Sequence, residues 1–171
     1  MNISGPTKRK ALQSVRQNSH PEVGDSAADD GPVNRVTNIT AGCFGGMEPI
    51  LLTGNHFKRS DIQQDYGVFL VQQKEALRQR GVMVVRNLED VPGSAAQAFH
   101  TICDTEEPLV DSAIIYLALD MFKLAGVTEP SDESAAKEAE RALNMLWKNS
   151  LRPQILLPLI TRLTETVHWI V

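Results

Sequence analysis

Four short apolar runs mark the chain beyond residue 46, and amphipathic segments separate them. The runs are PILLTG at 49–54, VMVVRNL at 82–88, AIIYLALD at 113–120 and HWIV at 168–171. Short apolar runs of this kind, bounded by turn or loop residues, are typical of strands buried within a sheet. We therefore predict a strand at each run.

Apolar residues recur at helical spacing between these runs, on one side of an otherwise polar segment. The predicted helices run from Ser60 or Asp61 to Arg80, over 93–104, from Asp132 to Asn149, and over 158–167. Pro153 and Pro158 are expected to bracket a break, with Pro158 opening the last helix. Strands that alternate with helices need crossover connections, so we predict an α/β fold with a mostly parallel sheet and helices on both faces.

Residues 1–46 differ from the rest of the chain in amino-acid composition. They are rich in Ser, Asn, Asp, Gly and Pro, carry both signs of charge and hold almost no aromatic residue. Such a segment buries too little apolar surface to offset the entropy of ordering, so we predict a disordered polar leader over 1–46 and a folded domain over 47–171. Asn38-Ile39-Thr40 in the leader is a glycosylation sequon, which matters only if the chain enters the secretory pathway.

Composition narrows the classes of function. The 171 residues are 42% hydrophobic, enough for one core, and the net charge of −4 indicates no nucleic-acid partner. Cys43 and Cys103 are too few for a disulfide scaffold and do not have zinc-ligand spacing, so no metal site is predicted. The N-terminus lacks the apolar core of a signal peptide, and no apolar run is long enough for a transmembrane helix.

In an open α/β sheet the usual binding site lies beyond the carboxyl ends of the strands. The predicted strands end there at Thr53, Gly54, Glu89, Asp90 and Asp120. Glu89 and Asp90 resemble the metal and water position of a nucleotide hydrolase, but the chain has no G-x-x-x-x-G-K-[ST] phosphate loop. We therefore predict no nucleotide binding and no cofactor, and interpret both carboxylates as loop or helix-capping groups.

Two other side chains raise the question of catalysis. Cys103 is a candidate nucleophile with His100 three residues before it, but no third group that would orient them is visible. A small buried hydrophobe is the favoured interpretation of Cys103. Trp147 is predicted to lie at the core edge of its helix, and His168 with Trp169 to pack at the rim.

Arg162 interrupts the apolar tail LLPLITRLTETVHWIV. Its charge must find a carboxylate, water or a phosphate, because arginine stays protonated in proteins. Helical spacing puts Arg162 at the edge of the core stripe beside Thr166, and the simplest interpretation pairs it with Glu165 on the surface. Spacing alone leaves the alternatives open.

The order of VMVVRNLEDVPGSAAQAFHTICDTEEPLVDSAIIYLAL, the charged helix ending LWKNS, and LITRLTETVHWIV resembles the carboxyl-terminal activator domain of the torsin-interacting, lamina-associated polypeptide family. The resemblance covers 47–171. It implies a degenerate AAA+-like domain without a phosphate loop that is not itself an enzyme. Such a domain docks beside a torsin, an AAA+ ATPase of the endoplasmic reticulum and nuclear envelope, and presents an arginine finger to the ATP of that partner.

By position, the resemblance implies that Arg162 is the finger, with Thr161, Glu165 and Thr166 at the partner interface and Cys103 as one half of a disulfide. Family members carry a membrane-spanning helix and an opening strand and helix, so membrane association is expected for the family, and the sheet is expected to be incomplete at its N-terminal edge. The alternative is a structural or interaction module of the same membranes that keeps the fold without activating anything.

Overall fold

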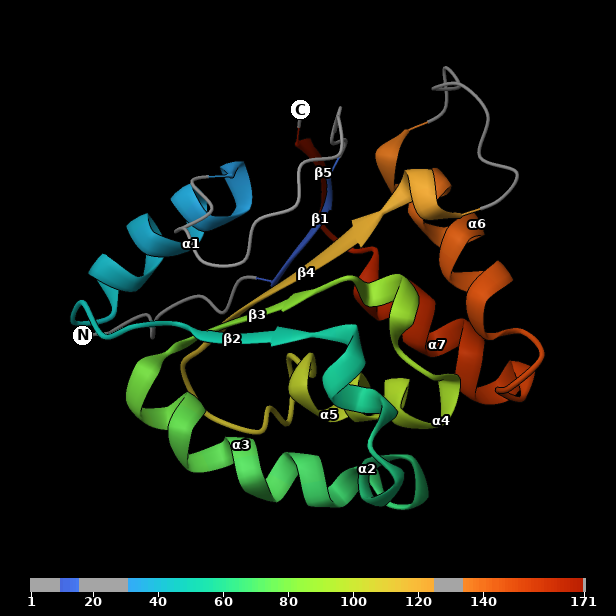
Figure 1. The fold of residues 1–171 in the computed structure, drawn as a ribbon, viewed down its shortest axis with the longest axis horizontal. Coiled ribbons are helices and arrows are strands. Elements are labelled where there is room, and N and C mark those ends of the chain that lie inside the picture. The colour runs from blue at the N-terminus through green and yellow to red at the C-terminus, as the bar shows by residue number, and fades with distance from the viewer. Residues whose placement is uncertain (1–9, 16–30, 125–133, 171) are drawn as a thin grey trace, which may run out of the picture.

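A five-stranded parallel sheet forms the centre of the molecule (Figure 1). The computed structural model describes residues 10–15, 31–124 and 134–170. The strands are β1 (Lys10–Val15), β2 (Ile50–Thr53), β3 (Val82–Arg86), β4 (Ile114–Asp120) and β5 (Val167–Ile170). They pair in the order β2-β3-β4-β1-β5, which is consistent with a P-loop-NTPase-like fold. The predicted α/β class is confirmed, as are strands at all four apolar runs, although Val171 lies outside the described residues.

Helices cover both faces of the sheet, as predicted (Figure 1). On one face α1 (Pro32–Cys43) packs over β3 and β4. The larger core lies on the other face, where most of the remaining helices pack. Those helices are α2 (Ser60–Gln64), α3 (Tyr66–Arg80), α4 (Gly93–Ala96), α5 (Ala98–Ile102), α6 (Ala135–Trp147) and α7 (Pro153–Leu163). Short 3₁₀ helices follow β2, β3 and β4 at Gly54–Lys58, Leu88–Asp90 and Met121–Lys123.

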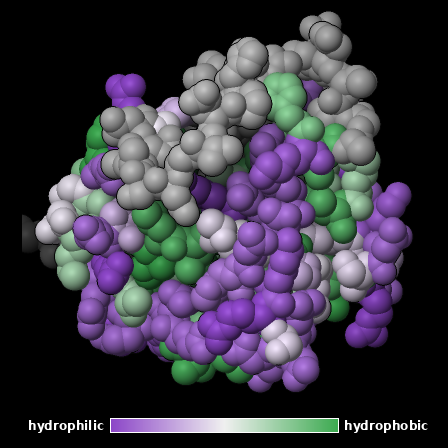
Figure 2. All heavy atoms as spheres, in the orientation of Figure 1, coloured by the Kyte–Doolittle hydropathy of each residue, from purple (hydrophilic) through white to green (hydrophobic). Residues whose placement is uncertain are grey.

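Successive side chains of β3 pack alternately into the cores on the two faces of the sheet. Val82 and Val84 pack in the α1 layer, whereas Met83 and Val85 belong to the larger core, and all four are fully buried. The edge strand β2 is less covered: Figure 2 shows apolar atoms at the surface over it, and its Leu51 is 60% exposed. Full burial of β3 explains why its sequence is a continuous apolar run rather than an alternating one.

The prediction of a disordered leader is wrong for two of its segments. Residues 10–15 form β1, which lies inside the sheet between β4 and β5, and 32–43 form α1. Hydrogen bonding to a neighbour on both sides stabilises β1, while Val33 and Ala41 of α1 pack against the sheet. A strand and a helix thus lie ahead of residue 47, where the sequence analysis expected neither. Residues 1–9 and 16–30 lie outside the described residues.

Two predicted helix limits are corrected as well. The segment over 60–80 breaks at Asp65, whose side chain accepts a hydrogen bond from the Gly67 amide and caps α3. Pro153, not Pro158, opens the last helix, and Pro158 lies inside it on the exposed side. Burial of Leu156, Leu159 and Leu163 along the opposite side keeps α7 continuous despite the backbone hydrogen bond that Pro158 cannot donate.

The described residues include no helix with the length and apolar character that a membrane crossing requires.

Gly81 ends α3 in a left-handed conformation, with φ 72° and its amide bonded to Leu77 O at 2.9 Å. A Cβ at this position would collide with the Phe44 ring. We expect Gly81→Ala to lower the free energy of unfolding by more than about 1 kcal/mol, through both backbone strain and the clash. Gly42→Ala is the matched control, since its Cβ would meet nothing within 4 Å, and should be neutral or slightly stabilising. Urea unfolding measures both, and equal effects would contradict the assignment.

His56 should make the free energy of unfolding depend on pH. Its ring contacts Phe57 and Phe69 edge-on, and its Nε2 is buried without a hydrogen-bond partner. Burial and then the nearby Arg59 lower the pKa of His56 from its ordinary 6.5, against the opposing effect of Asp61. The unfolded chain therefore binds the proton more readily, so the free energy of unfolding should fall as pH drops below 6.5. In urea unfolding at pH 7 and pH 5, His56→Gln should show a smaller difference than the unmodified chain; an unchanged difference would assign it to other groups.

Candidate functional site

The carboxyl ends of β2, β3 and β4 bring the predicted polar residues to one edge of the sheet. Thr53 ends β2, Glu89 and Asp90 lie in the 3₁₀ helix after β3, and Asp120 ends β4. Close packing holds this edge together, because a Cβ on Gly54 would collide with the carbonyl of Asn87 and with Asp90. The sequence thus predicted which residues gather here, since the strands are parallel and in register.

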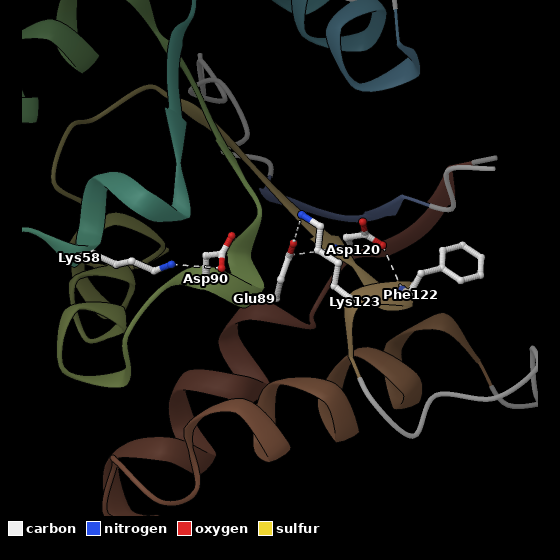
Figure 3. Close-up of polar contacts among 6 residues, drawn as sticks. All are labelled: Lys58, Glu89, Asp90, Asp120, Phe122 and Lys123. Atoms are coloured by element: carbon white, nitrogen blue, oxygen red, sulfur yellow. Dashed lines mark hydrogen bonds and ion pairs between the residues drawn. The ribbon is translucent and has the colours of Figure 1, made fainter. Parts of the chain in front are cut away.

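Glu89 is the most buried charge of this edge. Its side chain is 5% exposed, and its Oε1 lies 3.0 Å from Lys123 Nζ (Figure 3). Its Oε2 accepts a hydrogen bond from the Asp120 amide at 3.1 Å. Hydrogen bonding with the Glu89 side chain, reinforced by the charge of that carboxylate, outweighs burial and raises the pKa of Lys123. The ammonium therefore stays charged beside the carboxylate.

The two other carboxylates of the edge also have partners within the chain. Asp90 Oδ1 lies 3.2 Å from Lys58 Nζ in a more exposed pair, and Asp120 Oδ1 accepts from the Phe122 amide at 3.0 Å (Figure 3). Glu89 and Asp90 lie in the connection between β3 and α4 and cap no α-helix, which is the loop alternative of the prediction. An ammonium group lies beside each of these two carboxylates, Lys123 beside Glu89 and Lys58 beside Asp90. In the described segments no three His, Cys, Asp or Glu side chains are arranged to hold a metal.

A cavity of about 230 Å³ lies between this edge and the start of α1. Arg86 at the end of β3 donates to Asn34 Oδ1 across it, and Asn87 beside them has φ 53°. Small-molecule sites usually measure about 300–1,000 Å³, so this volume is low for a nucleotide. Its lining carries one guanidinium, from Arg86, and one carboxylate, from Asp120.

Arg162 lies at a second site, which shares no lining residue with the cavity. Its Nη1 lies 2.8 Å from Asp104 Oδ2 and donates to the His100 carbonyl at 2.6 Å. The side chain is 33% exposed, and its Nε and Nη2 donate to no residue that the structure describes. The expected pairing with Glu165 is therefore wrong: the partner is a carboxylate at the end of α5, brought near by packing of α5 on α7.

An open groove of about 760 Å³ surrounds Arg162. It is bordered by α7, by Glu140 of α6 and by Thr105 after α5. Its lining includes Leu157, which is 61% exposed, and carries two carboxylates, from Glu140 and Glu165, against one guanidinium. Thr161 and Glu165, two of the three predicted interface residues, line this groove, whereas Thr166 is exposed but does not.

The remaining candidates line neither the cavity nor the groove, although the His100 carbonyl contacts Arg162. Cys103 is buried and Cys43 is exposed on α1, and no disulfide joins the two in the structure. His100 Nε2 contacts the Ile155 carbonyl at 3.1 Å instead of orienting a nucleophile. Asn38 is exposed on α1, and its glycosylation stays a prediction.

The predictions for the two tryptophans and His168 have different outcomes. Trp147 is buried and donates from its indole nitrogen to the Val91 carbonyl at 2.9 Å, as a core residue should. His168 is exposed on β5, and the side chain of Trp169 lies outside what the structure describes.

Lys123, Arg86 and Asp104 are among the residues of these sites that the sequence analysis missed. Lys123 lies three residues beyond Asp120, and Arg86 immediately precedes the acidic loop, so proximity to strand ends was a usable signal for both. Asp104 had no such signal, because its bond to Arg162 depends on how α5 packs against α7.

The Glu89–Lys123 pair should matter more for stability than the exposed Lys58–Asp90 pair. Lys123→Met leaves a carboxylate that is 5% exposed without its counter-charge, and we expect a loss of about 1–3 kcal/mol in unfolding free energy. Lys58→Met is the matched control and should change it by less than about 1 kcal/mol. Glu89→Gln in the Lys123→Met background should restore part of the loss. Urea unfolding at pH 7 measures the four chains, and equal effects of the two lysine variants would contradict this difference.

No family model matches the chain. A section of 131 residues, 75% of the chain, is 29% identical to replicase polyprotein 1ab of Alphamesonivirus 1 (isolate Aedes harrisoni/Cote d'Ivoire/C79/2004). The chain spans about 2% of the length of that polyprotein. The similarity is therefore to one short section of a much longer protein and assigns no activity to this chain.

Proposed function

We propose that the chain is a non-catalytic activator that docks beside a torsin-type AAA+ ATPase and supplies Arg162 to the ATP bound by that partner. The observation that carries the proposal is the state of Arg162: Nη1 is held by Asp104 and His100, while Nε and Nη2 have no partner among the described residues and the side chain borders an open groove. A guanidinium in this state can donate two further hydrogen bonds to a phosphate oxygen of a neighbouring molecule.

The carboxyl edge of the sheet supports a role without catalysis by this chain. Lysines neutralise Glu89 and Asp90, and the adjacent cavity measures about 230 Å³. Catalysis of phosphoryl transfer relies on metal ions and donors that neutralise developing negative charge. A metal ion bound here would have to displace an ammonium from a buried carboxylate. The P-loop-NTPase-like fold is thus proposed to serve as a docking scaffold, in the endoplasmic reticulum and nuclear envelope as the family resemblance implies.

The charges and the apolar residue that line the groove determine which side chains the partner surface must carry. Glu140 and Glu165 border Arg162, so the groove by itself repels a phosphate more than an isolated arginine would. The surface of the ATPase that faces it should therefore carry Lys or Arg against these carboxylates and an apolar side chain against Leu157. The phosphate is then approached only within the assembled pair, which is how a finger supplied in trans works.

The test measures ATP hydrolysis by a torsin-type ATPase alone, with this chain, and with its Arg162→Ala form. We expect the unmodified chain to stimulate and Arg162→Ala to lose at least about tenfold of that stimulation, since a finger in trans contributes on the order of 10³ to 10⁵ in rate. Binding to the ATPase, measured by calorimetry, should persist.

Two controls make the result specific. Arg152→Ala removes an exposed arginine just before the same helix and should stimulate like the unmodified chain. Arg162→Lys keeps the charge but loses the planar fork, and should restore little. If Arg162→Ala binds, folds by circular dichroism and stimulates fully, the finger is wrong and the chain is an interaction module.

A further inference from the structure

Asp104 links the loop after α5 to Arg162. Its Oδ1 accepts hydrogen bonds from the Glu106 and Glu107 amides at 2.8 and 3.1 Å, while its Oδ2 lies 2.8 Å from Arg162 Nη1. The two oxygens thus have separate partners: one anchors the carboxylate to the loop after α5, and the other meets the guanidinium. Two backbone amides therefore hold the carboxylate in addition to its contact with the arginine.

The second contact of Nη1 comes from the backbone. The His100 carbonyl lies in α5, and Nη1 donates to it at 2.6 Å. His100 is itself tied to α7 through the contact of its Nε2 with the Ile155 carbonyl at 3.1 Å. The end of α5 therefore holds one nitrogen of the guanidinium through two acceptors, from two residues of a segment that packs on α7.

Holding one nitrogen limits the remaining freedom of the side chain. An arginine on a helix surface normally samples many rotamers, at about 2 kcal/mol of side-chain entropy. With Nη1 held, rotation about the Nε–Cζ bond would break both contacts, so the plane of the guanidinium is set. Nε and Nη2 then remain as the donors available to an external acceptor.

We propose that Asp104 is a positioning residue that orients the Arg162 guanidinium before docking, so that Nε and Nη2 face the phosphate of the neighbouring ATPase. This inference rests on the proposed function for its consequence in activity, but the orientation itself is a property of this chain. A preoriented guanidinium loses less freedom when it meets the phosphate, and misplacement of about 1 Å can lower a rate by as much as about 100-fold.

The variant that tests this is Asp104→Asn. Asparagine keeps an oxygen for the Glu106 and Glu107 amides but turns an NH₂ group toward Arg162 Nη1, which removes the charge and places donor against donor. Glu165→Gln is the matched control, because Glu165 also borders Arg162 in the groove but makes no hydrogen bond or ion pair with it. Both variants remove one carboxylate charge from the neighbourhood of Arg162.

The first measurement does not depend on activity. Nitrogen-15 NMR of the full chain follows exchange of the two Nη groups of Arg162, assigned by the signals that Arg162→Lys lacks. We expect slow rotation about Nε–Cζ in the unmodified chain and in Glu165→Gln, and rotation at least about tenfold faster in Asp104→Asn. Equal rotation in all three chains would overturn the proposal.

The second measurement separates positioning from docking. For each chain, stimulation of the torsin-type ATPase is titrated to obtain its maximum and the concentration at half-maximum. We expect Asp104→Asn to lower the maximum about tenfold with a half-maximum within about twofold of the unmodified chain, and Asp104→Glu to restore part of the maximum. Arg152→Ala, at a position outside the groove, is the activity control and should keep the maximum. A rise in the maximum of Asp104→Asn would instead mean that Asp104 restrains the finger, and would overturn the proposal.

The outcomes separate the two proposals. Suppose that the unmodified chain stimulates, that Arg162→Ala does not, and that Asp104→Asn matches the unmodified chain. The arginine finger is then supported, and the positioning role of Asp104 is contradicted. If no chain stimulates, the proposed function falls, and the NMR rotation rates still decide whether Asp104 orients Arg162. Should Asp104→Asn fail to fold by circular dichroism, Asp104→Glu gives the same comparison with the charge kept and the acceptor displaced by one methylene.

Discussion

Burial of the central strands on both faces is the constraint on which the rest of this structure depends. Residues 82–85 of β3 have no exposed surface, and 115–119 of β4 are buried as well. Their backbone groups can be satisfied only by neighbouring strands, and parallel neighbours can be joined only by crossover segments. Those crossovers become the helices on the two faces, and the parallel arrangement brings the strand ends together at one edge.

A second rule, that a charge removed from water needs a counter-charge, operates at both candidate sites. At the sheet edge it pairs Glu89 with Lys123, and in the groove it pairs Arg162 with Asp104. The consequences differ because the geometry differs. The side chain of Glu89 is 5% exposed and has both carboxylate oxygens contacted. The side chain of Arg162 is a third exposed, and the described part of the chain engages one of its nitrogens. The first site is closed by its own partners, and the second retains donors for another molecule.

Strands with a continuous apolar run were predicted from the sequence, and a strand without one was missed. The runs at 82–88 and 113–120 were recognisable as strands because strands buried on both faces are apolar throughout. KALQSV at 10–15 carries no comparable run, and its place between β4 and β5 comes from pairing with strands far along the chain. The composition of residues 1–46, averaged over the whole segment, therefore predicted disorder for 10–15, although this strand pairs within the sheet. The continuity of α7 through Pro158 has the same origin, because burial of its inner side outweighs one missing hydrogen bond.

The sequence by itself determined the α/β class, the strands at the four apolar runs, the parallel direction, and hence the meeting of Glu89, Asp90 and Asp120 at one edge. These features follow from local patterns and from rules of chain connection, both of which a single sequence carries. Only the tertiary structure decided that lysines neutralise that edge and that Arg162 bonds to Asp104 rather than to Glu165. The physical reason is that an ionic partner is chosen by distance in space, and helical spacing reports only neighbours on the same helix.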